Sequence, residues 1–111
     1  MADLTVTKIT KAAVTVPTLA AATSTGDTFT NTGRTFFWAK NASTGNRVFT
    51  FNSLVKNNFG DDVDVKITLA ASGEKLVGPF EPWRFSDSAD KVGISYSGSV
   101  TSLTVAAVEL P

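Results

Sequence analysis

The sequence predicts an all-β fold, a small antiparallel β-sandwich or barrel with an extended N-terminal arm. Three observations lead to this prediction. Apolar and polar residues alternate with a period of two in several segments, which is the pattern of half-buried strands. Clusters of Gly, Ser, Asn and Asp separate these segments at short intervals, as in sandwiches and small barrels. No segment longer than two turns carries a convincing helical stripe, and Thr, Val and Phe are abundant.

The N-terminal region differs from the rest of the chain. Residues 4–9 alternate well enough to form an edge strand. Residues 12–28 are mostly small, with weak periodicity, and two interpretations remain open: a loop with an irregular edge strand, or an extended arm lying over a neighbouring subunit. We therefore expect residues 1–25 to form a strand or arm and residues 26–111 the sandwich or barrel, within one structural domain.

The remaining strands follow from the residue pattern. Residues 35–39 are apolar on both faces, which predicts a strand between two layers or one that shows a face to a partner. Residues 47–51 place two Phe side chains on the same face. Residues 63–69 show the clearest alternation, and residues 91–97 and 102–110 repeat it.

The most distinctive segment is Gly-Pro-Phe-Glu-Pro-Trp-Arg-Phe at residues 78–85. Its two prolines restrict the backbone and prevent pairing in a sheet, which predicts a rigid crossover. We expect the rings of Phe80 and Phe85 to close one end of the sandwich. Trp83 and Arg84 are instead candidates for outward projection, because Trp and Arg are the residue types most frequent at interface hot spots.

Composition argues against catalytic chemistry and several classes of ligand. The sequence has no His and no Cys, so imidazole bases, thiolate nucleophiles and the usual zinc, copper or haem ligands are missing. Its net charge of zero lacks the basic excess of nucleic-acid-binding proteins. No apolar run is long enough to span a membrane, and the first residues lack a signal-peptide pattern. We expect no enzyme activity, cofactor, nucleic acid or membrane partner, and synthesis in the cytoplasm.

Clustered acidic residues offer weak candidates for a metal site. Asp61, Asp62 and Asp64 could bind calcium or act as an acid–base pair, but their spacing differs from that of a calcium-binding loop. Charges at a turn and at the start of a strand explain them better. Asp87 and Asp90 fit an Asx turn without any ligand.

A resemblance covers most of the chain from Thr25 onward. It rests on the Gly-Pro-Phe…Arg-Phe-Ser-Asp string within residues 74–87, the Tyr-Ser strand at residues 91–97 and its continuation at residues 103–108. Residues 26–36, and Asn41 in the turn after them, extend it. In these segments the chain resembles a family of small proteins encoded among the head genes of tailed bacteriophages, typically near the gene for the major capsid protein.

The resemblance implies a virion structural protein similar to capsid decoration or cement proteins. Such a protein would lie on the capsid surface, made in the host cytoplasm. It would bind the major capsid protein and other copies of itself, as a dimer or trimer. The interface residues that we predict come from the presumed arm, the doubly apolar strand and the proline-rich segment: Val14, Val16, Leu19, Trp38, Trp83 and Arg84.

Two other functions remain open. A head–tail connector, neck or tail-tube subunit would form a ring around DNA, and a ring lumen should bring a charge bias on one strand face, which the sequence does not show. A carbohydrate-binding surface module is the third interpretation, because β-sandwiches with exposed Trp and Asp often bind sugars.

Overall fold

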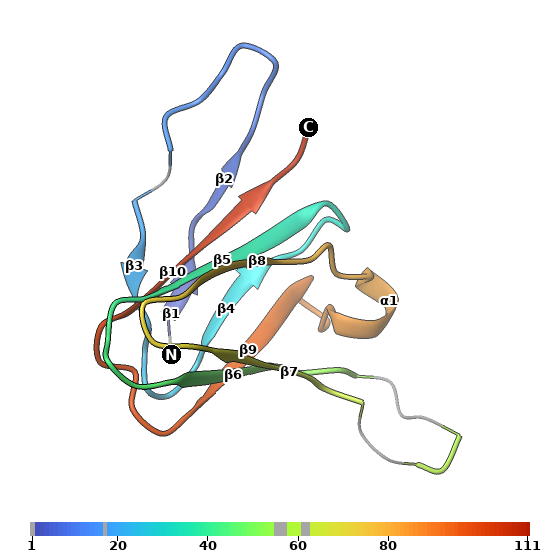
Figure 1. Ribbon diagram of the computed structural model, residues 1–111. Helices are drawn as coiled ribbons and strands as arrows, with labels where there is room; N and C mark the ends of the chain where they lie inside the picture. The colour runs from blue at the N-terminus through green and yellow to red at the C-terminus, as the bar shows by residue number, and fades with distance from the viewer. Residues whose placement is uncertain (1, 17, 55–57, 61–62) are drawn as a thin grey trace.

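The computed structural model describes residues 2–16, 18–54, 58–60 and 63–111, and it confirms the all-β, sandwich-like fold (Figure 1). Two mixed sheets face each other. Sheet A has the order β1 (Ala2–Leu4), β4 (Asp27–Thr30), β9 (Lys91–Ser97), β6 (Arg47–Phe51) and β7 (Val65–Leu69). Sheet B has the order β2 (Val6–Lys8), β10 (Leu103–Glu109), β5 (Thr35–Asn41) and β8 (Glu74–Val77), with β3 (Ala20–Ala21) also paired to β10.

The segments with the clearest alternation form the strands predicted for them. β6 and β9 have the expected bounds, and β7 and β10 lie within the expected segments. The short strands β4 and β8 were not predicted. Two of the four residues of β8 are charged and β4 begins with Asp27, so neither shows a clear apolar period.

The prediction of one edge strand over residues 4–9 is confirmed only in part: Val6–Lys8 form the edge strand β2, but the chain changes sheets at Thr5. β1 pairs with β4 in sheet A, whereas β2 pairs with β10 in sheet B. A single residue is too short a connection for β1 and β2 to pair with each other, so each takes an edge position in a different sheet. Both pairings are parallel, which departs from the purely antiparallel arrangement that the sequence suggested.

A separate N-terminal arm is not confirmed. β1, β2 and β3 all belong to the sheets, so both ends of the expected arm are part of the sandwich. Between β2 and β3, residues 9–16 and 18–19 instead leave the sandwich as a long loop, drawn in blue at the top of Figure 1. We call this segment the projecting loop.

An aromatic cluster fills the space between the sheets. Its closest ring pairs join Phe51 to Phe80 at 4.6 Å and Phe37 to Phe51 at 5.2 Å between centroids. Each such pair stabilises the fold by about 0.5–1.5 kcal/mol beyond the area that it buries. The prediction that Phe80 and Phe85 pack into the core is confirmed, because both are buried and their rings lie 5.4 Å apart. The buried Phe residues of the cluster are Phe29, Phe37, Phe49, Phe51, Phe80 and Phe85.

The segment after β8 contains a one-turn helix, α1 (Pro82–Phe85), where we expected a rigid crossover. Pro82 stands at the start of the helix, where its missing N–H costs no hydrogen bond. Ser86 ends the turn by donating its backbone N–H to the carbonyl oxygen of Pro82. Within the described part of the chain, no helix is long and apolar enough to cross a membrane.

Candidate protein interface

The two outer faces of the sandwich differ in chemistry. In sheet A the inward positions carry the core, and the outward positions are mainly hydroxyl-bearing or charged, with Val48 as an aliphatic exception. In sheet B the outward positions are more apolar, although Lys40, Glu74 and Thr104 lie together at one end. The polar outer face of sheet A carries Asp3, Thr28, Thr50, Lys66, Thr68 and Ser95; the apolar outer face of sheet B carries Phe36, Trp38, Leu76, Ala106 and Val108.

Trp38 lies at the middle of this apolar face. Its neighbours across the sheet are Ala106 on β10 and Leu76 on β8. The indole N–H donates to a carboxylate oxygen of Glu74 at 3.0 Å, and the side chain is half-buried. For residues 35–39 we predicted either a strand between two layers or a strand that shows one face to a partner. The position between two layers is wrong, because only one face of β5 packs against the core.

An apolar hollow of about 200 Å³ deepens one end of the same face. It is lined by Ile9, Phe36, Leu76, Val108 and Leu110, without any polar side chain. Leu76 is 69% exposed and Leu110 is 39% exposed. Sequence reasoning missed Ile9, Val108 and Leu110 as surface residues, because alternation alone does not tell which apolar positions near a strand end stay outside.

The projecting loop extends the apolar face. Val14 and Val16 are 42% and 69% exposed, whereas Leu19 is half-buried. A second hollow, of about 260 Å³, lies between the loop and the sheet, and it shares Ile9 and Val108 with the first. The outer face of sheet B and the valines of the loop therefore form one continuous apolar surface.

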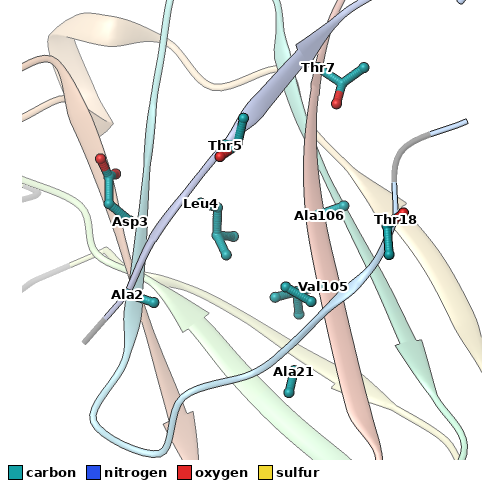
Figure 2. Close-up of a pocket in the computed structure, with 10 residues that line it drawn as sticks. Ala2, Asp3, Leu4, Thr5, Thr7, Thr18, Ala21, Val105 and Ala106 are labelled. Atoms are coloured by element: carbon teal, nitrogen blue, oxygen red, sulfur yellow. The ribbon is translucent and has the colours of Figure 1, made fainter. Parts of the chain in front are cut away.

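A third hollow, of about 380 Å³, opens beside the loop (Figure 2). It exists because β2 and β3 both pair with β10, at Ala107–Glu109 and at Thr104–Val105, and leave a gap at Ala106. Its lining is mainly small or aliphatic, with Thr hydroxyls at the rim and Asp3 as a charged group. A small apolar side chain could enter it, but it holds no group arranged for catalysis.

Trp83 and Arg84 lie away from this surface, on α1 (Figure 1). Trp83 is 71% exposed. Arg84 turns inward instead: its guanidinium donates to the carbonyl oxygen of Val63 at 2.7 Å and lies 4.7 Å from the centre of the Phe85 ring. The six residues predicted for the interface are therefore not brought together. Val14, Val16 and Trp38 share the apolar surface, Trp83 is exposed elsewhere, and Arg84 supports the fold of α1.

A buried pair of an aspartate and a tyrosine lies inside the sandwich. Asp27 is fully buried, and its Oδ2 accepts hydrogen bonds from the hydroxyl of Tyr96 at 2.6 Å and the backbone N–H of Thr23 at 3.2 Å. Burial and the adjacent carboxylate raise the pKa of Tyr96 well above its ordinary value. Among the described residues Oδ1 of Asp27 has no partner, and none of the hollows reported above is lined by it.

The other acidic candidates have structural roles. Asp64 accepts a hydrogen bond from the backbone of Ser53 at 2.7 Å, while Asp61 and Asp62 lie outside the described residues. The Asx turn at Asp87 is confirmed, because its Oδ1 accepts the N–H of Ala89 at 2.8 Å. In the part of the chain that the structure describes, no three potential metal ligands gather.

No protein-family model, curated protein or solved structure matches the chain. The resemblance to phage head proteins therefore stays a prediction, and a function must be argued from the surfaces themselves.

Proposed function

We propose that this chain is a structural protein of a tailed-bacteriophage virion, a decoration or cement protein that binds the assembled shell of the major capsid protein and stabilises it. The observation that carries the proposal is the continuous apolar surface of sheet B and the projecting loop. The resemblance over residues 74–108 supplies the class of partner.

The apolar surface favours binding to a protein. Large exposed side chains such as Leu76 and Val16 cost free energy in water, about 25 cal/mol per Å² of apolar area that a partner could cover. Contiguous apolar patches rimmed by polar residues mark interaction sites more often than scattered exposed residues do. The opposite, polar face of sheet A is suited to remain in solvent.

Stabilisation of a shell would then follow from mass action. A protein that binds the assembled lattice, and not the dissociated subunits, shifts the equilibrium toward the lattice. At a free concentration about 100 times Kd, the gain is about 2.7 kcal/mol per site. Many equivalent sites on one shell add up to a large resistance against internal pressure.

The test is co-sedimentation of the purified chain with shells assembled from the major capsid protein encoded beside it. Deletion of residues 1–25 is unsuitable, because it removes β1, β2, β3 and the buried Leu4 and would unfold the domain. Leu76→Lys is preferable, since it places a charge on the apolar face at an exposed position of β8. Ser95→Lys, on the polar face, is the matched control.

We expect saturable binding of the wild-type chain and of Ser95→Lys, and about a tenfold or greater loss of affinity for Leu76→Lys. Cryo-electron microscopy of the complex should show copies distributed over the whole shell. A single ring at one vertex would overturn the proposal in favour of a connector. Wild-type protein that stays in the supernatant at every shell concentration would refute a role on the shell.

A further inference from the structure

We propose that the projecting loop of one copy adds as an antiparallel strand to the free edge of β8 in a second copy, with Val14 opposite Leu76 and Val16 opposite Glu74. This contact links copies head to tail. It does not depend on the proposed function, since both halves of the contact lie on this chain.

The acceptor is the outer edge of sheet B. β8 is the last strand of that sheet and pairs with β5 on one side only. The backbone N–H of Asn41 donates to the carbonyl oxygen of Gly73 at 2.8 Å, so the residues of β8 that face β5 are Lys75 and Val77. Glu74 and Leu76 must then direct their N–H and C=O groups away from the sheet, ready to pair with another strand.

The donor is residues 14–16 of the projecting loop. Within the described residues, Val14, Thr15 and Val16 make no hydrogen bond, and all three are exposed. Unpaired, exposed backbone is readily added to a sheet edge, and β-branched residues favour the extended conformation. In the register proposed, the N–H and C=O groups of Val14 and Val16 face those of Leu76 and Glu74.

The donor and acceptor of one molecule cannot meet each other. The projecting loop connects β2 and β3, which both pair with β10, whereas β8 lies at the opposite edge beyond β5 (Figure 1). A projecting loop that occupies the β8 edge must therefore come from another molecule. A second copy supplies a segment of matching length and composition.

Charge and side-chain chemistry also match. Between Asp3 and Asp27 the only charged residues are Lys8 and Lys11, so the loop is basic. The β8 edge is flanked by the exposed carboxylates of Glu74 and Glu81, which a basic loop complements. Residues directly opposite in a sheet share a face, so Val14 would lie beside Leu76 and extend the apolar surface across the junction.

Three proline variants test the contact. Val16→Pro removes a donor N–H, and Leu76→Pro removes an N–H of the acceptor edge that has no partner within one copy. Thr15→Pro is the matched control, because the N–H of Thr15 points away from β8 in the proposed register. Circular dichroism and thermal melting establish that each variant is folded before its association is measured.

Sedimentation equilibrium should show concentration-dependent association of the wild-type chain and of Thr15→Pro. Val16→Pro and Leu76→Pro should each raise the dissociation constant about tenfold or more. A mixture of these two should form one-to-one dimers and nothing larger, because only one donor and one acceptor remain intact. Amide hydrogen exchange should slow at Val14, Val16, Glu74 and Leu76 as the wild-type concentration rises.

Any of three results would overturn the contact. The wild-type chain could stay monomeric at the highest concentration attainable. It could associate without protection of these four amides. Thr15→Pro could lose association between copies as completely as Val16→Pro. Shell binding, measured separately by co-sedimentation, distinguishes failure of this contact from failure of the proposed function.

Discussion

The outer faces of sheets A and B are built on one core, yet they present opposite surfaces. Both sheets turn Phe side chains inward, Phe49 and Phe51 from sheet A and Phe37 from sheet B. Outward, sheet A shows mostly Thr, Ser and charged residues, whereas sheet B shows Phe36, Trp38 and other apolar groups. Folding requires only the inward pattern, so the apolar outer face of sheet B calls for another explanation, and binding provides one.

The β1 edge of sheet A and the β8 edge of sheet B also differ in polarity. At the β1 edge of sheet A, Asp3 is held by Lys91 and by the hydroxyl of Thr28, and these contacts lower the pKa of its carboxyl group. Charged groups in such pairs protect an edge against unwanted pairing. At the β8 edge of sheet B, Leu76 remains exposed beside unpaired backbone groups. Face and edge of sheet B are thus both open to a partner.

The largest effect is expected in the core that the two faces share. Phe37→Ala removes a fully buried ring that packs against Phe29, Phe49 and Phe51. We expect the free energy of unfolding to fall by about 3–5 kcal/mol, measured by chemical denaturation. The matched substitution Phe36→Ala, one position along on the outer face, should cost clearly less. Equal losses would mean that the outer face of sheet B is as much a part of the fold as the core.

A second substitution tests how the apolar face is packed at its end. Gly78 has a φ of 137°, and a Cβ built there would lie 3.1 Å from both the Phe36 ring and the carbonyl oxygen of Thr35. Gly78→Ala should therefore combine backbone strain with overcrowding and destabilise the fold by about 2 kcal/mol or more. Gly60→Ala, at a φ of 80° with open space around it, isolates the backbone contribution. If both variants melt alike, crowding against Phe36 and the Thr35 carbonyl oxygen plays no role.

The buried pair of Asp27 and Tyr96 gives a smaller effect on the free energy of unfolding, and this effect depends on pH. The unfolded chain releases the Tyr96 proton near pH 10, whereas the folded chain retains it at higher pH. The unfolded state then binds fewer protons, so stability should be full below pH 10 and fall as the pH rises above it.

Tyr96 is the single tyrosine, so its absorbance reports this titration directly. Tyr96→Phe should cost about 1–3 kcal/mol near neutral pH, because Asp27 loses the hydroxyl that donates to it, and it should remove the alkaline loss that this group causes. An ordinary tyrosine titration in the folded protein would contradict the pairing.

The sequence predicted the core-facing residues of each sheet better than the residues of the outer faces. Alternation identified β9 because Val92 and Ile94 alternate with Lys, Gly and Ser, and β6 because Phe49 and Phe51 share one face. It did not reveal the change of sheets at Thr5, since this depends on which edges are vacant elsewhere in the fold.

The candidate interface was predicted in part for the same reason. Val14, Val16 and Trp38 stood out by composition, but the contributions of Ile9, Val108 and Leu110 arise only when three distant segments meet. Arg84 was assigned to the surface by residue type alone. Its partners, Val63 and Ser53, are more than twenty residues away in the sequence and could not be foreseen.

The smallest effect on stability is expected for a pair of substitutions that compares the two outer faces directly. Leu76→Lys and Ser95→Lys each place a charge on an exposed, outward strand position, and each should change the free energy of unfolding by no more than about 0.5 kcal/mol. Binding of a hydrophobic fluorescent dye should nevertheless fall for Leu76→Lys alone, because only that substitution interrupts an apolar surface. If Leu76→Lys instead destabilised the isolated chain by several kcal/mol, the apolar face would be serving the fold, and its exposure could no longer be attributed to a partner.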